Sequence, residues 1–253
     1  MNDQEKHPEI ASFQSLWSGG YFEGDPLDPL GRSTYGRLGY MSVLHATYLA
    51  CIKPYLTAST VALEIGPGRG AWSKCLLAAG RLYCLDALSA EHNGFWDYVG
   101  RHERVTYQQV DDFSAAAVPD DSIEYLFSYG TFCHLSPPAI REYLTSLRAK
   151  LRPDAHGFVM FADYEKYNRA ATDLSLGWER ALPGAARSAI TAYRSLRRPK
   201  LVESGGDLEP SPGRWYHMGI EPMAELLSSL GYVVLDPDMG VNHRDPVVHF
   251  VRP

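Results

Sequence analysis

The sequence is poor in cysteine, and it contains no apolar run long enough to cross a membrane. Its four cysteines lie far apart and form no C-x-x-C pair, so we expect reduced thiols packed in the core. The first residues, MNDQEKHPEIASF, are polar and include no apolar targeting segment. These absences predict a cytoplasmic protein without a membrane span.

The sequence also lacks an excess of basic residues. Its formal net charge is −6 and its isoelectric point is near 5.8. Proteins that bind nucleic acids usually carry a basic excess that displaces counterions from the phosphates, so we expect no nucleic-acid partner. With 253 residues, 45% hydrophobic and 21% charged, the chain has the composition of a globular domain with a sizeable core.

Strand and helix patterns alternate from residue 61 onward. The strand patterns are followed by helical ones up to a fifth strand, and the chain closes with a helix and two more strands. This order predicts an α/β fold whose mostly parallel sheet is covered by helices on both faces. The expected strands lie at 61–65, 81–86, 104–110, 122–130, 157–163, 232–236 and 246–251.

Two segments depart from this alternation. Residues 1–58 are predicted to form an N-terminal arm of loop and helix, and residues 59–253 form the main domain. Within that domain, residues 164–221 are an insertion after the fifth strand. Because ligands bind outside the carboxyl ends of parallel strands, we expect the insertion to cover the substrate; a decoration on the solvent side is the alternative.

A glycine-rich turn follows the first of these strands, in the stretch TVALEIGPGRGAW. Gly66 and Gly68 permit a tight bend and a close approach of a ligand, and the next helix offers free N–H groups to an anion. With Gly70, the letters fit both the dinucleotide fingerprint and G-x-G-x-G. Glu64 favours the second pattern, because a carboxylate there would repel a pyrophosphate but suits an ammonium or a water network around an amino acid.

The glycine turn, Asp86 at the end of the second strand, an acidic pair after the third strand and the closing strand pair together resemble class I S-adenosylmethionine-dependent methyltransferases. The resemblance implies a Rossmann-like, doubly wound sheet of seven mostly parallel strands with the last strand antiparallel. It also implies S-adenosylmethionine as methyl donor. No metal is expected, because the scattered carboxylates of Asp112 and Asp163 form no metal-binding motif.

The resemblance implies a role for each matching residue. Asp86 would bind both ribose hydroxyls, Asp111 or Asp112 would meet the adenine amino group, and Phe113 or Val110 would pack against the adenine ring. The residues expected around the methionine part of the cofactor are Glu64, Gly66, Gly68, Gly70, Ser128, Tyr129 and Gly130.

His134, in the stretch FSYGTFCHLS, is the candidate catalytic residue. Histidine titrates near neutral pH and could remove a proton from a hydroxyl, although a structural role beside loop carbonyls is equally compatible with the sequence. Weaker candidates for contact with the acceptor are Asp163, Tyr164 and His217. Aromatic residues of the arm could fold over the cofactor or be plain packing.

The expected reaction is methylation of a hydroxyl on a small molecule or saccharide, since the pattern is similar to bacterial methyltransferases of surface-glycan and natural-product clusters. Three alternatives stay open at the level of the sequence. They are methylation of a small-molecule amine, a non-catalytic module that binds S-adenosylmethionine, and a nicotinamide-dependent dehydrogenase.

Overall fold

The computed structural model describes residues 6–33, 35–176 and 215–253. Its centre is a seven-stranded sheet with the order β5-β4-β3-β6-β7-β9-β8. The strands are β3 (Val61–Ile65), β4 (Arg81–Asp86), β5 (Val105–Gln109), β6 (Ile123–Ser128), β7 (Leu151–Met160), β8 (Val233–Asp236) and β9 (Val247–Val251).

The direction of the strands follows the prediction. Strands β3 to β7 pair in parallel, whereas β9 runs antiparallel to both β7 and β8. The seven-stranded, mostly parallel sheet with an antiparallel last strand is therefore confirmed. Strand β7 is longer than predicted, because it begins at Leu151 immediately after the preceding helix and continues through Pro153.

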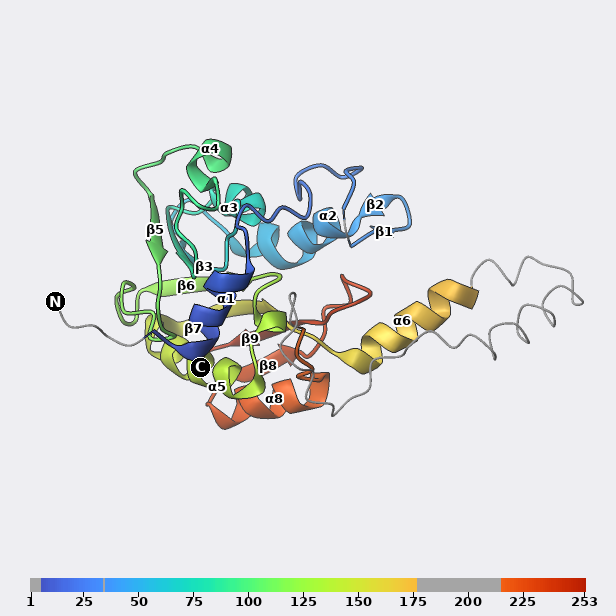
Figure 1. The fold of residues 1–253 in the computed structure, drawn as a ribbon. Helices are drawn as coiled ribbons and strands as arrows, with labels where there is room; N and C mark the ends of the chain where they lie inside the picture. Colours follow the sequence, from blue (N-terminus) through green and yellow to red (C-terminus); the bar gives the residue numbers. More distant parts are fainter. Residues whose placement is uncertain (1–5, 34, 177–214) are drawn as a thin grey trace, which may run out of the picture.

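Helices cover both faces of the sheet (Figure 1). One face packs against α1 (Pro8–Leu16), α5 (Pro137–Lys150) and α8 (Ile220–Ser229). The other face packs against α2 (Val43–Thr47), α3 (Ala71–Leu76) and α4 (Phe95–Val99). Because both faces are covered, the central strands are apolar over nearly their whole length, as parallel strands usually are.

Helix α5 shows how local sequence sets these elements. The Ser136 hydroxyl caps it by accepting a hydrogen bond from the Ala139 N–H at 3.4 Å, and Pro137 occupies its first turn. Ile140 and Leu144, one turn apart, are fully buried against the sheet. The local sequence therefore explains where this helix begins and which of its residues pack against the sheet.

The N-terminal arm contains a helix that the sequence analysis did not predict. In α1, Pro8 lies in the first turn, and the imidazole of His7 accepts a hydrogen bond from the Glu9 N–H at 3.3 Å. Ile10 is buried against the main core, so tertiary packing stabilises this short helix. Further along the arm, β1 (Arg37–Leu38) and β2 (Met41–Ser42) form a hairpin before α2.

The insertion begins with α6 (Tyr164–Leu176), which runs away from the sheet edge in Figure 1. The chain returns at His217, which forms a parallel bridge with Ala162. Residues 177–214 lie outside the described residues, so the role of the insertion as a substrate cap stays a prediction.

The cysteines and the helices of the described residues can be compared with the expectations from composition. All four cysteines are buried and unpaired, which confirms packed thiols. Among the helices that the structure describes, none is both long and apolar enough to cross a bilayer.

Candidate functional site

A cavity opens at the carboxyl ends of β3, β4 and β6, between the sheet and the N-terminal arm. Its lining includes Gly66 and Gly68 of the glycine turn, Asp86, Tyr129 and His134. The topology brings these residues together, since the carboxyl ends of neighbouring parallel strands meet at one edge of the sheet. These five residues, all singled out from the sequence, thus share one cavity.

The glycine turn bends sharply under the cavity. Gly66 has φ +72°, and a Cβ atom built on it would lie 1.8 Å from the Thr131 hydroxyl oxygen. Gly68 has φ +53°, and its Cβ position lies 3.2 Å from the Tyr21 carbonyl oxygen. Gly70 does not line the cavity; it begins α3, and its Cβ position lies 2.2 Å from Val99 of α4. The first two glycines therefore shape the cavity, and the third permits close packing of two helices.

Asp86 ends β4 with its carboxylate held in place. One carboxylate oxygen accepts a hydrogen bond from the Gly68 N–H at 3.0 Å, and the other accepts one from the Leu88 N–H at 2.8 Å. Burial raises the pKa of Asp86, and these hydrogen bonds oppose that shift. The result is a fixed acceptor pair at the cavity wall, which is the geometry expected for binding two neighbouring hydroxyls.

The end of β5 presents apolar groups to the cavity rather than acids. Val110 and Phe113 both line it, and the packing of one or the other against an adenine ring stays a prediction. Asp111 instead pairs with Lys6 at 3.1 Å, and Asp112 accepts hydrogen bonds from the N–H and hydroxyl of Ser114. Neither aspartate is among the lining residues, so the predicted contact of one of them with adenine finds no support in their positions.

The loop after β6 supplies Tyr129, Gly130 and His134 to the cavity. Ser128 does not line it; its buried hydroxyl donates to the Ile65 carbonyl at 2.9 Å and ties β6 to β3. The His134 ring lies edge-on to Trp17 of the arm, with 5.1 Å between ring centroids. His134 is therefore placed at the junction of the cavity and the arm.

Glu64 lies beneath the glycine turn and is not among the residues that line the cavity. It is only 2% exposed and accepts hydrogen bonds from the Ser73 hydroxyl at 2.5 Å and the Cys84 thiol at 3.7 Å. Burial, opposed by these donors, raises its pKa from 4.5 to about 8. The Glu64 carboxylate, which the sequence predicted at the methionine part of the cofactor, is thus hydrogen-bonded to buried core residues instead.

This raised pKa predicts how stability depends on pH. As pH rises above about 4.5, the unfolded chain releases the Glu64 proton while the folded chain retains it up to about pH 8. The free energy of unfolding should therefore fall by up to roughly 1.4 kcal/mol per pH unit in this window. Glu64→Gln should remove that contribution, which urea unfolding at pH 5, 6, 7 and 8 would show. Identical pH slopes for the variant and the wild type would contradict it.

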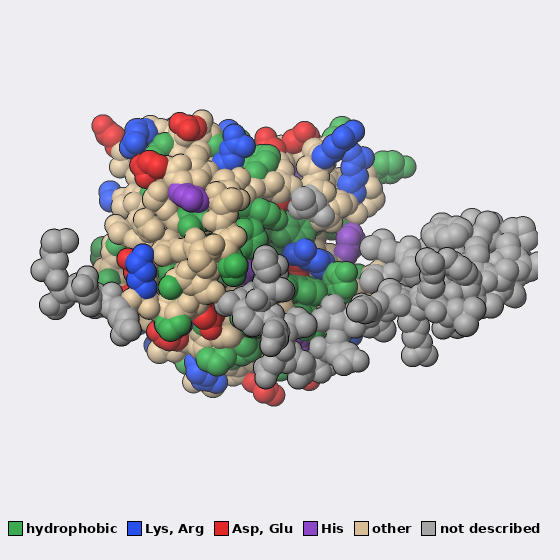
Figure 2. Space-filling view, in the orientation of Figure 1, with side chains coloured by type: hydrophobic (Ala, Val, Ile, Leu, Met, Phe, Trp, Pro, Cys, Tyr) green, Lys and Arg blue, Asp and Glu red, His purple; other side chains and the backbone are tan. Residues whose placement is uncertain are grey.

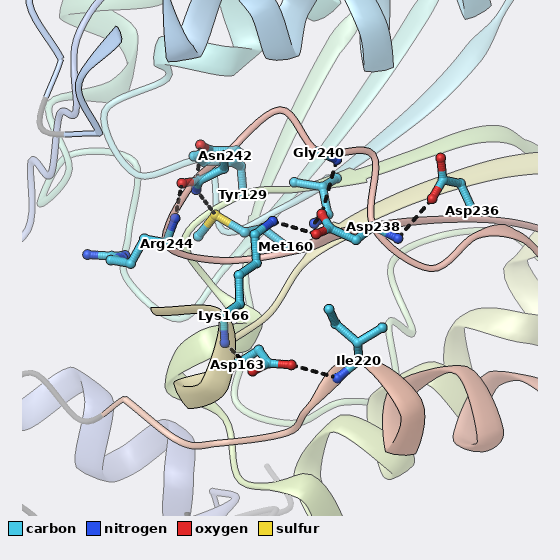
Figure 3. A network of polar contacts seen from close by, with 11 residues as sticks. Tyr129, Met160, Asp163, Lys166, Ile220, Asp236, Asp238, Gly240, Asn242 and Arg244 are labelled. Atoms are coloured by element: carbon cyan, nitrogen blue, oxygen red, sulfur yellow. Dashed lines mark hydrogen bonds and ion pairs between the residues drawn. The ribbon is translucent and has the colours of Figure 1, made fainter. Parts of the chain in front are cut away.

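The three weaker candidates gather at the end of β7, away from the cavity lining. Asp163 accepts hydrogen bonds from the N–H groups of Lys166 and Ile220, so it joins the starts of α6 and α8 (Figure 3). His217 accepts a hydrogen bond from the Tyr164 N–H at 3.1 Å. These contacts connect the two ends of the insertion, and a role in acceptor binding stays a prediction.

Several residues that line the cavity were not predicted from the sequence. Ile10 and Phe13 come from the unpredicted helix α1, and their three-residue spacing was the available signal. Trp17 and Tyr21 are among the aromatic residues of the arm for which the sequence left open whether they cover the cofactor or only pack. Both line the cavity. Glu23 of the arm also lines it and had no signal in the sequence, because its neighbours in space are distant along the chain.

The described residues contain no cluster of three or more His, Cys, Asp or Glu side chains arranged to hold a metal ion.

Comparisons with known proteins identify the fold. No protein-family model and no curated protein matches the sequence. In structure, the chain is similar to geranyl diphosphate C-methyltransferase from Streptomyces coelicolor A3(2), with 9% identity, TM-score 0.56 and coverage of 98% of this chain and 99% of that one. It is also similar to a SAM-dependent methyltransferase from Aquifex aeolicus, with 16% identity, TM-score 0.51 and coverage of 82% and 93%.

A third similar structure is 1,6-didemethyltoxoflavin-N1-methyltransferase from Burkholderia thailandensis, with 16% identity, TM-score 0.51 and coverage of 83% of this chain and 77% of that one. The fold is therefore that of the class I S-adenosylmethionine-dependent methyltransferases, as the sequence predicted. By name, the first of these proteins is a C-methyltransferase and the third an N1-methyltransferase, whereas the second is named only as a SAM-dependent methyltransferase. The fold therefore leaves the acceptor atom open.

Proposed function

We propose that this protein transfers a methyl group from S-adenosylmethionine to a hydroxyl of a small molecule or saccharide. The observation that carries the proposal is the single cavity in which the glycine turn, the fixed carboxylate of Asp86 and the apolar side chains of Val110 and Phe113 meet. Together they match the anionic, hydroxylic and aromatic parts of one nucleoside ligand.

The residues fit this cofactor along the length of the cavity. The absence of side chains at Gly66 and Gly68 leaves room for a ligand over the backbone, and Asp86 offers two oxygens to a ribose. Val110 and Phe113 would pack against the adenine ring. When bound, S-adenosylmethionine supplies an electrophilic methyl group on a positively charged sulfur.

His134 is the residue we assign to proton removal from the acceptor. It lines the same cavity, and a histidine can accept a proton near neutral pH. The remaining task of the protein is to align the acceptor with the methyl group and to exclude water. Methylation of a neutral amine, whose nitrogen is a better nucleophile than a neutral hydroxyl oxygen, would need this histidine less.

The surface supports a small acceptor rather than a polyanion. Acidic and basic side chains are interspersed over the face shown in Figure 2, and the chain as a whole carries a net charge of −6. Since binding to nucleic acid depends on neutralising phosphates with clustered basic residues, this distribution favours a small-molecule or saccharide acceptor.

The proposal predicts selective stabilisation by the demethylated cofactor. S-adenosylhomocysteine at about 100 times its dissociation constant should add roughly 2.7 kcal/mol of stability, which raises Tm by roughly 5–10 °C for a chain of this size. NADH should leave Tm unchanged. Thermal unfolding of the full chain with either ligand and with neither would measure this.

Asp86→Ala is the variant that ties such a shift to the cavity. The substitution removes the ribose acceptor, so S-adenosylhomocysteine should no longer raise Tm, and Asp112→Ala, outside the lining, is the matched control. A shift with NADH alone, or a shift of equal size in Asp86→Ala, would overturn the assignment of the cavity.

A further inference from the structure

Glu23 is a buried acid that the cavity contains and the roles given above do not use. It lies in the arm segment that crosses the glycine turn, where the Arg69 N–H donates to the Tyr21 carbonyl at 3.2 Å. The indole N–H of Trp72, in the first turn of α3, donates to one oxygen of Glu23 at 2.5 Å. Trp72 in turn packs against Tyr129, with 4.6 Å between ring centroids.

These contacts fix Glu23 at one end of the cavity. Trp72 lies at the start of α3 and Tyr129 directly after β6. Val110 and Phe113 instead follow β5, on the other side of β3 in the sheet. Since Val110 and Phe113 are assigned to adenine, Glu23 lies toward the opposite end, where the amino-acid part of the cofactor belongs.

The carboxylates around the cavity each accept hydrogen bonds from at least two donors, and they differ in burial and in whether they line the cavity. Asp86 and Glu64 have the donors described above, and Glu9 accepts hydrogen bonds from the N–H and hydroxyl of Ser136. Glu23 accepts from the Trp72 indole and its own backbone N–H, while it is only 6% exposed. Its burial outweighs these two donors and raises its pKa from 4.5 to about 7.

A buried carboxylate in a ligand cavity is stabilised best by a cation with N–H donors. The methionine part of S-adenosylmethionine carries such a group in its α-ammonium. We propose that Glu23 binds this ammonium, and that it takes the place the sequence suggested for Glu64. The inference rests on the proposed function, and it makes the N-terminal arm part of the cofactor site rather than only its cover.

The test compares ligands that differ in the amino-acid part. S-adenosylhomocysteine carries the ammonium, and 5′-methylthioadenosine keeps the adenosine and the thioether but lacks the whole amino acid. In calorimetric titrations of the full chain, Glu23→Gln should weaken S-adenosylhomocysteine roughly 10–100-fold and leave 5′-methylthioadenosine within about threefold of the wild type.

Glu64→Gln is the matched control, because it removes the charge of the other buried glutamate near the turn. It should leave the affinity of both ligands within about threefold. Equal weakening of both ligands by Glu23→Gln, no weakening of either, or a selective loss in Glu64→Gln would overturn the role of Glu23. Failure of the wild type to bind either ligand would instead overturn the proposed function.

A second measurement varies the ligand, and its first comparison uses the wild-type protein alone. An S-adenosylhomocysteine analogue in which hydrogen replaces the amino group keeps the carboxylate and the carbon chain. The wild type should bind it roughly 10–100-fold more weakly than S-adenosylhomocysteine, and Glu23→Gln should bind the two with affinities within about threefold. Equal affinity of the wild type for the two ligands would overturn the proposal.

Discussion

Replacing Gly66 by alanine should lower Tm by roughly 5–15 °C and abolish stabilisation by S-adenosylhomocysteine. The backbone at Gly66 has φ +72°, which costs a residue with a Cβ roughly 1–2 kcal/mol. The added methyl group would also lie 1.8 Å from the Thr131 hydroxyl oxygen, and relieving such overlap costs roughly 1–3 kcal/mol more. Each kcal/mol corresponds to roughly 2–4 °C in a chain of this size.

Gly94→Ala is the matched control for this prediction. Gly94 has φ +60°, but the position of its Cβ atom has no neighbour within 4 Å, so only the backbone cost applies. Thermal unfolding of both variants, with and without S-adenosylhomocysteine, separates strain from overlap. Equal losses of Tm in the two variants would show that Thr131 moves aside freely, and would contradict a close fit of the turn to the loop after β6.

Replacing His134 by alanine should lower the methylation rate of a hydroxyl acceptor by roughly 10²–10⁴-fold, the usual contribution of a general base. The residue lines the cavity and packs against Trp17 and Phe13, so the substitution also removes ring contacts. His134→Gln retains bulk and hydrogen bonding without a proton acceptor near neutral pH. Both variants should bind S-adenosylhomocysteine as the wild type does, which calorimetry would verify.

His243→Ala is a suitable control for the rate measurement, because His243 is outside the cavity lining and contacts the Arg37 carbonyl at 3.1 Å. Its rate should stay within about twofold of the wild type. A loss below tenfold in both His134 variants would rule out the general-base role and would favour an amine acceptor, which needs less help with its proton.

The arrangement of Glu23 changes how the arm is understood. From sequence, residues 1–58 were an arm of open function, and the structure joins them to the glycine turn through backbone contacts and the indole of Trp72. Because α1 and the segment that follows it form one wall of the cavity, ligand binding and ordering of the arm should be energetically linked.

The sequence by itself determined the fold and singled out several residues that line the cavity. Strand periodicity placed all seven strands, since residues of a buried parallel sheet form short apolar runs that turns interrupt. Local chemistry also predicted the glycine turn, and the family resemblance singled out Asp86, which lies at the cavity wall. Each of these depends on neighbours only a few residues away in the chain or on the end of one strand.

Only the tertiary structure decided which polar side chains face the cavity. Glu64, Asp111 and Asp112 lie at the positions that the family pattern suggests, but other protein groups engage their carboxylates, which are not among the residues lining the cavity. Glu23 is separated from Trp72 by 49 positions along the chain, and no local pattern encodes their contact. Side-chain orientation depends on packing between segments that are distant along the chain. The sequence therefore predicted the sheet, whereas the tertiary structure determined which acidic side chains line the cavity.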